Sequence, residues 1–290
     1  MTNDKHQTLE TYPLHEVIAV CGAVGGAGRT SVTVNLAASL AKKKRRIRIV
    51  DGDLQFGDTA LALDLQPSLT VKDIAEREDE KNVHDYWTVH ESGIELLAAP
   101  HRPEHADLMT ADRFGSLIES LQISSDILVV DAETGLTERS LQVMEKADRI
   151  LLVTTPRMAA LKHTRLMAET LQVLDLKHKV DLIVNQFTAD SVMKAKEMTE
   201  LTGVENVHFL PYDYKRMPKS LDVGIPLVES NPKLSFSIEI GKLAEELFPN
   251  LQNTREKQSA VNKMMNRLKG SRGNRHEFIS KTSIKDSRRS

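Results

Sequence analysis

The sequence predicts an α/β protein with a three-layer, doubly wound and mostly parallel sheet. Three observations carry this prediction. Short apolar runs alternate with longer helical patterns, most of the runs are rich in Val, Ile and Leu without polar alternation, and a glycine-rich turn joins the first run to the first helix. Such runs are typical of parallel strands buried on both faces. The alternation indicates helices on both sides of the sheet, and ligands of such folds bind at the carboxyl ends of the strands.

The elements follow in order along the chain. Apolar runs predict strands over 16–22, 46–51, 93–99, 126–132, 149–155, 180–186 and 206–211. Helical patterns between them include 30–42, 111–122, 137–146, 157–174, 190–202 and 234–247. An aromatic content of only 4% suits an Ala-, Leu- and Val-rich core of this kind. The single cysteine, Cys21, excludes a disulfide framework and a multi-cysteine metal site within one chain.

Composition divides the chain into three parts. Residues 1–14 are expected to form a flexible N-terminus, residues 15–250 the α/β domain, and residues 251–290 a basic tail. Residues 252–290 carry a net charge of +8, so the rest of the chain carries the −10 that gives −2 overall. Such tails often meet anionic partners. The polar start and the lack of an apolar run of ~20 residues predict a cytoplasmic protein.

The stretch "CGAVGGAGRTSV", residues 21–32, follows the first strand and opens the first helix. Its glycines can turn backbone N–H groups around an anion, beside the positive end of the helix dipole. Against the pattern G-x-x-x-x-G-K-[ST], Gly28 and Thr30 match, Ala23 stands at the first glycine position and Arg29 at the lysine position. This predicts a fold of the P-loop NTPase type. The alternative is a glycine-rich turn without a ligand.

Two later strands end in aspartate. "RIRIVDGDLQFGD" places Asp51 and Asp53 at one strand end, and "DILVVDAETG" places Asp131 at another, with Gly135 four residues on. A phosphate loop needs carboxylates at such positions, one to hold Mg²⁺ and one to orient the attacking water. Each aspartate alone could be a turn-capping residue. Three signals in the right order favour the nucleotide site.

With these motifs, residues 15–250 resemble the MinD/ParA-type ATPases, the deviant Walker-A or SIMIBI group. Their loop pattern K-G-G-x-G-K-[ST] aligns with "VGGAGRT", residues 24–30. Within the group, the chain looks most similar to the CpaE/TadZ branch, which helps to place pilus assembly machinery. The stretches that carry this finer resemblance are 51–74, 147–167, 182–187 and 222–247.

The resemblance implies ATP/ADP and Mg²⁺ as ligands and assigns roles to residues of this chain. Asp53 would position the hydrolytic water and Arg29 would supply the loop cation, so these two are the expected catalytic residues. The metal would be held by Thr30, Asp51 and Asp131. The nucleotide would be held by Gly25, Gly26, Ala27, Gly28, Arg29, Thr30, Ser31, Asn185 and Pro211, with Asn185 at the adenine base. A strand-end turn residue is the alternative for Asn185.

Three departures from the family pattern weaken the expected hydrolysis. Val24 replaces the signature lysine, which in the family reaches the phosphates of a partner subunit. Arg29 replaces the loop lysine, and its planar fork is not interchangeable with an ammonium group. Glu133 stands where the family usually has proline and would add a negative charge near the γ-phosphate. Because loss of cations costs orders of magnitude in phosphoryl transfer, we expect binding with slow or absent turnover.

The tail contains a short helical pattern over about 257–269, with a disordered end. Its apolar residues fall within an arc of about 140°, with lysine and arginine outside that arc. Such a helix lies on an anionic membrane or docks on protein, and the first case implies a peripheral position at the inner face of the membrane. The basic stretch 41–48 is expected to be the end of the first helix.

The predicted function is therefore that of a dimerising, nucleotide-dependent spatial organiser of the MinD/CpaE kind, a homodimer that recruits pilus or secretion machinery proteins. Two alternatives stay open. One is a non-hydrolysing scaffold that kept the fold. The other is a ParA-like DNA-partitioning ATPase, which ranks lower because the finer resemblance is to the pilus branch, so a nucleic-acid partner is not favoured.

Overall fold

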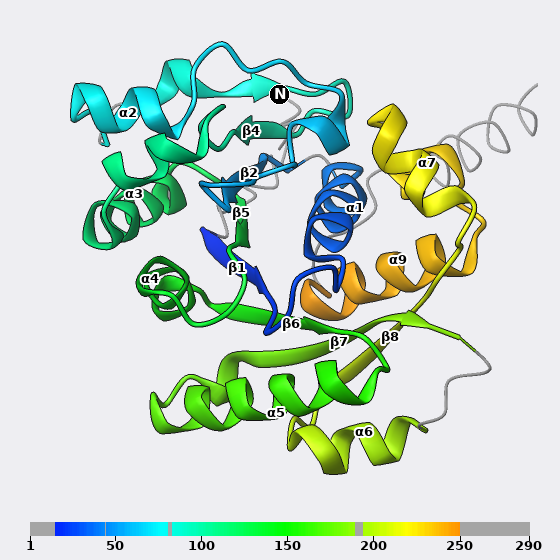
Figure 1. The fold of residues 1–290 in the computed structure, drawn as a ribbon. Coiled ribbons are helices and arrows are strands. Elements are labelled where there is room, and N and C mark those ends of the chain that lie inside the picture. Colours follow the sequence, from blue (N-terminus) through cyan, green and yellow to red (C-terminus); the bar gives the residue numbers. More distant parts are fainter. Residues whose placement is uncertain (1–14, 44, 81–82, 189–193, 250–290) are drawn as a thin grey trace, which may run out of the picture. The chain divides into compact units, whose positions relative to one another are not determined.

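The computed structural model describes residues 15–43, 45–80, 83–188 and 194–249 (Figure 1). The predicted N-terminal segment 1–14 and the predicted basic tail with its helix at about 257–269 lie outside the described residues. The same holds for the first residues of the predicted helix 190–202.

The centre of the described part is a single sheet in the strand order β3-β4-β2-β5-β1-β6-β7-β8. The strands are β1 (Glu16–Cys21), β2 (Ile47–Gly52), β3 (Thr88–Val89), β4 (Glu95–Leu97), β5 (Ile127–Ala132), β6 (Arg149–Thr154), β7 (Val180–Phe187) and β8 (Val207–Pro211). All neighbours pair in parallel except β3 and β4, which are antiparallel. The predicted parallel, doubly wound sheet is confirmed.

Helices cover both faces of this sheet, which completes the three layers (Figure 1). In chain order they are α1 (Arg29–Ala41), α2 (Val71–Arg77), α3 (Ala111–Ile123), α4 (Glu138–Lys146), α5 (Met158–Val173), α6 (Ala195–Thr202), α7 (Arg216–Val223), α8 (Leu227–Ser230) and α9 (Ser235–Leu247). One face carries α1 and α9, which pack on each other, and the other carries α3, α4 and α5. No helix in the described ranges is long and apolar enough to cross a membrane.

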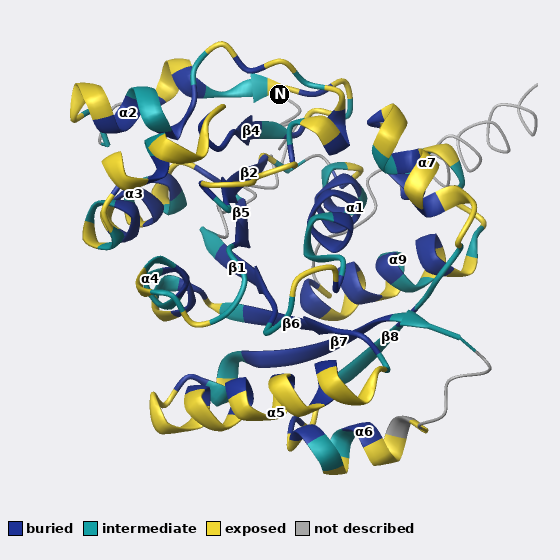
Figure 2. Ribbon diagram, in the orientation of Figure 1, coloured by how far each residue is buried: buried dark blue, intermediate teal, exposed yellow. Residues whose placement is uncertain are grey.

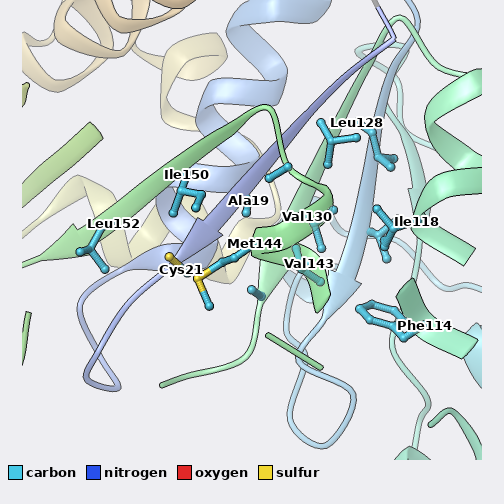
Figure 3. Close-up of a cluster of buried hydrophobic side chains, with 14 of the residues drawn as sticks. Ala19, Cys21, Phe114, Ile118, Leu128, Val130, Val143, Met144, Ile150 and Leu152 are labelled. Atoms are coloured by element: carbon cyan, nitrogen blue, oxygen red, sulfur yellow. The ribbon is translucent and has the colours of Figure 1, made fainter. Parts of the chain in front are cut away.

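The inner strands are buried along their length, whereas the outer helices keep exposed outer faces (Figure 2). This is why the strand runs show no polar alternation. On the α3 and α4 side, aliphatic side chains of β1, β5 and β6 meet those helices in one cluster (Figure 3). Members of the cluster include Ala19, Cys21, Phe114, Ile118, Leu128, Val130, Val143, Met144, Ile150 and Leu152.

Two parts of the fold differ from the sequence prediction. The expected strand 93–99 is shorter, and the antiparallel strand β3 beside it was not predicted. Helices α2, α7 and α8 were not predicted either, because each is only about two turns or less and has little room for a periodic pattern. The start of α2 does carry a sequence signal, a capping box in which Thr70 and Asp73 bond each other's backbone N–H groups.

The topology brings three strand ends together. β1 lies between β5 and β6, so the chain winds away from β1 in both directions along the sheet. At the carboxyl edge, Asp131 on β5 is in register with both Asp51 on β2 and Val20 on β1. The loop that follows β1 therefore opens directly over the two aspartates, at the switch point where ligands of such folds bind.

Candidate functional site

The glycine-rich loop leads from β1 into the N-terminus of α1. Gly28 is the N-cap residue, at φ 90°, and among the described residues no side chain caps the first turn. The first N–H groups of α1 are therefore free to meet an anion. A Cβ added at Gly25 or Gly26 would meet nothing within 4 Å, so this part of the loop faces open space.

The opposite side of the loop is held by the end of β7. Asn185 is buried, and its Nδ2 donates to the Ala27 carbonyl oxygen over 2.8 Å. Gln186, at φ 58° in a bulge of β7, donates from Nε2 to the Gly26 carbonyl oxygen over 3.3 Å. A Cβ at Gly28 would lie 2.2 Å from Asn185 Nδ2, so only glycine allows this close approach.

Two buried aspartates lie beneath the loop. The Thr30 hydroxyl donates to Asp131 Oδ2 over 2.7 Å. Asp51 accepts the backbone N–H of Thr59 on Oδ2 over 3.0 Å and that of Asp53 on Oδ1 over 3.3 Å. Both aspartates are almost fully shielded from solvent. The three residues predicted to hold a metal thus come together at one point.

Burial changes how these carboxyls titrate. It raises the pKa of Asp51 to about 8, and the neighbouring charge of Asp131 adds to the rise. It also raises the pKa of Asp131 to about 6, although Arg29 and the Thr30 hydroxyl act in the opposite direction. Buried carboxyls that lack a full set of donors favour a cation as partner. The electrostatics therefore fit a divalent metal.

The Arg29 side chain runs toward the carboxylates. Its Nη2 donates to Asp53 Oδ2 over 3.2 Å and to the Thr134 hydroxyl over 3.0 Å. Its Nη1 lies 4.0 Å from Asp131 Oδ1. Only 12% of the side chain is exposed. The predicted catalytic pair, Arg29 and Asp53, is therefore an ion pair in this structure.

The expected effect of Glu133 on the site needs correction. Its carboxylate forms an ion pair with Arg139, with Nε 3.3 Å from Oε1, and it also accepts the Thr137 hydroxyl. Both partners belong to the start of α4, and the two charged side chains are largely buried. Glu133 was expected to add a negative charge near the γ-phosphate, and the structure shows that Arg139 offsets this charge.

The remaining predicted residues lie around this centre. Gly135 donates its N–H to the Gly22 carbonyl oxygen over 2.9 Å, which ties the loop after β5 to the end of β1. Pro211 ends β8 and is in register with Phe187, so it lies beside the β7 end that carries Asn185. Val24 is half-buried in the loop. The functional roles assigned to all these residues stay predictions.

Sequence reasoning did not single out several residues that shape the site. Thr134 accepts a hydrogen bond from Arg29, and Arg139 forms an ion pair with Glu133. The backbone N–H of Thr59 donates to Asp51. Thr134 lies inside the quoted "DAETG", so its place beside a strand end was a usable signal. The role of Thr59 depends on how the loop after β2 folds back, and the sequence carries no short-range signal for that.

The residues present fit a nucleotide with Mg²⁺. Among the described residues, two buried polar atoms in the centre lack a hydrogen-bond partner, Asp131 Oδ1 and Arg29 Nη1. A buried acceptor of this kind is costly unless a ligand satisfies it. Together with the open loop at Gly25 and Gly26, it leaves oxygen donors for a metal and N–H groups for phosphate oxygens.

Comparisons with known proteins show the family and the fold of the chain. Residues 15–184 match the AAA domain family AAA_31. The septum site-determining protein MinD of Synechocystis is 26% identical over 89% of this chain and 100% of its own length. A ParA family ATPase from Chlorobium tepidum has a TM-score of 0.74, with 22% identity over 79% of this chain and 98% of that one. MinD from Pyrococcus horikoshii, solved with Mg-ADP, has a TM-score of 0.72, with 23% identity over 80% and 96%. The two structural likenesses concern the fold.

Proposed function

This chain belongs to the AAA domain family and is a P-loop ATPase of the MinD/ParA type, and from that premise we propose that it binds ATP and ADP with Mg²⁺ at the carboxyl ends of β1, β2 and β5. One observation carries the proposal. An open phosphate loop at the N-terminus of α1 lies over two buried carboxylates, and the Thr30 hydroxyl donates to one of them, Asp131. Thr30, Asp51 and Asp131 would hold Mg²⁺, which supplies charge neutralisation at the phosphates.

Hydrolysis at this site is weak. Val24 has no charge to offer a neighbouring subunit, and Arg29 donates from Nη2 to Asp53 and Thr134. Asp53 in turn is held by Arg29 and accepts the Phe56 N–H on Oδ1. A carboxylate that must orient water is less free to do so while it is paired. The expected result is a nucleotide switch with slow turnover.

The bound nucleotide favours a homodimer that recruits pilus or secretion machinery proteins. This step rests on the resemblance of 51–74 and 222–247 to the CpaE/TadZ branch. These two segments meet: a Cβ at Gly224 would clash with the backbone of Asp64 at 2.3 Å. In the first of these segments, Phe56 is 73% and Leu61 is 68% exposed, so both side chains are accessible to a partner.

Calorimetry with ADP and ATP in the presence of Mg²⁺ tests the nucleotide site. We expect saturable binding of both, and the absence of binding would refute the proposal. Size-exclusion chromatography with light scattering, with and without ATP and Mg²⁺, tests the dimer. A mass that stays monomeric in ATP would refute the nucleotide-dependent dimer while leaving the binding site intact.

A non-hydrolysing scaffold is the second candidate, and the Arg29–Asp53 ion pair favours it, because it engages both predicted catalytic residues. Phosphate release distinguishes the two candidates. Slow release that Asp53→Ala abolishes supports the ATPase, and no release above the level of Asp53→Ala supports the scaffold. Arg102→Gln, which removes one exposed charge outside the site, is the control and should leave phosphate release unchanged.

A further inference from the structure

The cation of the phosphate loop, Arg29, lies beside Asp131, which is one of the predicted metal ligands. Asp53 and Asp131 both form their ion pairs with Arg29, at 3.2 Å and 4.0 Å. The stem of Arg29 reaches them across Gly22, where an added Cβ would lie 3.4 Å from Arg29 Cδ. A residue with a side chain at position 22 would crowd this path.

The guanidinium group leaves the carboxylates incompletely satisfied. Asp131 Oδ1 and Arg29 Nη1 are both buried, and neither has a hydrogen-bond partner in the described part of the chain. Carboxylate oxygens hold Mg²⁺ at about 2.1 Å, far closer than this nitrogen approaches. The ion pair therefore balances charge in the buried site but does not supply the coordination that Asp131 can accept.

Arg29 is long enough and wide enough to reach two strand ends at once. Its Nη2 contacts Asp53 after β2 and Thr134 after β5, while its Nη1 faces Asp131. A lysine carries its N–H donors on a single nitrogen and would not offer two separate nitrogens to this set. The arrangement is therefore a property of the substitution found in this chain.

We propose that in the nucleotide-free protein the Arg29 guanidinium serves as the positive partner of Asp131, so that Arg29 and a divalent cation compete for this carboxylate. The inference rests on the proposed function in so far as Asp131 is a metal ligand. It assigns to Arg29 a second role besides contact with phosphate. Arg29 offsets the charges of Asp131 and Asp53, and it lowers the affinity of the nucleotide-free protein for metal.

Binding of Mn²⁺ to the nucleotide-free protein tests this, measured by electron paramagnetic resonance as loss of the free-ion signal. Arg29→Gln removes the charge but keeps a polar side chain. We expect its Mn²⁺ affinity to exceed that of the unaltered protein at least about tenfold, because one buried unit charge next to a cation site changes binding by more than that. The matched control is Arg102→Gln, an exposed arginine paired with Glu104, which should leave Mn²⁺ affinity unchanged.

Adding Asp131→Asn to Arg29→Gln should abolish the gain, which places the bound Mn²⁺ at this site. An unchanged or lower Mn²⁺ affinity for Arg29→Gln would overturn the proposal, and so would a gain that survives Asp131→Asn. Should Arg29→Gln fail to fold, Arg29→Lys gives the same test, with a smaller gain expected and no gain overturning the idea. Failure to bind ADP in Mg²⁺ would refute the proposed function alone, since the Mn²⁺ comparison uses no nucleotide.

Discussion

Asn185 anchors the phosphate loop to the end of β7: its Nδ2 donates to the carbonyl oxygen of Ala27 over 2.8 Å, although the two residues are 158 positions apart in the sequence. The bond is buried and joins the end of β7 to the loop after β1. Oδ1 of Asn185 is also buried and has no partner among the described residues. One side of this amide therefore fixes the loop, and the other is available to a ligand.

Replacing Asn185 tests its contact with the loop and its predicted contact with the base. Asn185→Ala leaves the Ala27 carbonyl without its buried donor, so we expect a loss of about 1–3 kcal/mol in the free energy of unfolding. Affinity for ADP should fall at least about tenfold. Calorimetry with pyrophosphate, which has no base, shows the origin of that loss. If pyrophosphate and ADP weaken together, the loop contact dominates, and if only ADP weakens, Asn185 acts on the base. Unchanged stability and unchanged affinity would contradict both roles.

Gly28 is required by the same contact. Gly28→Ala places a Cβ against Asn185 in a backbone at φ 90°, so we expect a loss of about 2–4 kcal/mol in the free energy of unfolding. Gly25→Ala is the matched control, because an added Cβ there meets nothing within 4 Å. Urea unfolding of both nucleotide-free variants measures the difference. Equal stability of the two variants would show that the close approach of Asn185 does not constrain the loop.

The sequence predicted the centre of the site better than its surroundings. The positions of the loop, Asp51 and Asp131 at neighbouring strand ends could be predicted, because parallel strands bring their carboxyl ends to one edge of the sheet. Their roles stay predictions. The direction of Arg29 could not be predicted, since it depends on where Asp53 and Thr134 lie in space. The ion-pair partner of Glu133 could not be predicted for the same reason. Its partner Arg139 is brought to it by the turn into α4.

The Glu133–Arg139 ion pair shields the site from a negative charge. Arg139→Met removes the donors that face Glu133, so the largely buried carboxylate is left without its cation. We expect weaker ADP binding, by roughly threefold to tenfold, and a loss of about 1–2 kcal/mol in stability. The double variant Glu133→Gln with Arg139→Met should recover most of the affinity. Calorimetry on the unaltered protein, the single variants Arg139→Met and Glu133→Gln, and the double variant gives the coupling energy, and purely additive effects would contradict the shielding role.

Val24 offers a test of the slow turnover that we propose. By the family resemblance, a lysine at this position reaches the phosphates of a partner subunit. Val24 is half-buried in the loop, so Val24→Lys can extend its ammonium group toward solvent. We expect phosphate release from ATP to rise severalfold, and to rise further with protein concentration because the lysine acts across a dimer. Val24→Ala is the size control. Turnover that is equally low in both variants would show that Val24 is not what limits hydrolysis.

The buried Asp51 makes the stability of the nucleotide-free protein depend on pH. Burial and the charge of Asp131 raise the pKa of Asp51 to about 8, whereas an aspartate in the unfolded chain has a pKa of about 3.9. Between these values the folded state holds a proton that the unfolded state has released. The contribution of Asp51 is therefore fully present below about pH 4, and it falls as pH rises toward 8, by at most about 1.4 kcal/mol per pH unit.

Asp51→Asn removes this titration, so its free energy of unfolding should fall less steeply between about pH 5 and pH 8 than that of the unaltered protein. Urea unfolding at several pH values in this range measures the two slopes. Asp107→Asn, which alters an exposed carboxylate in the segment before α3, controls for the loss of one acidic group. The comparison uses slopes, because asparagine can accept only one of the two N–H groups, from Asp53 and Thr59, that Asp51 accepts. Parallel slopes for Asp51→Asn and the unaltered protein would show that Asp51 is already ionised in the folded state at the acidic end of this range, and that burial beneath the phosphate loop does not control its charge.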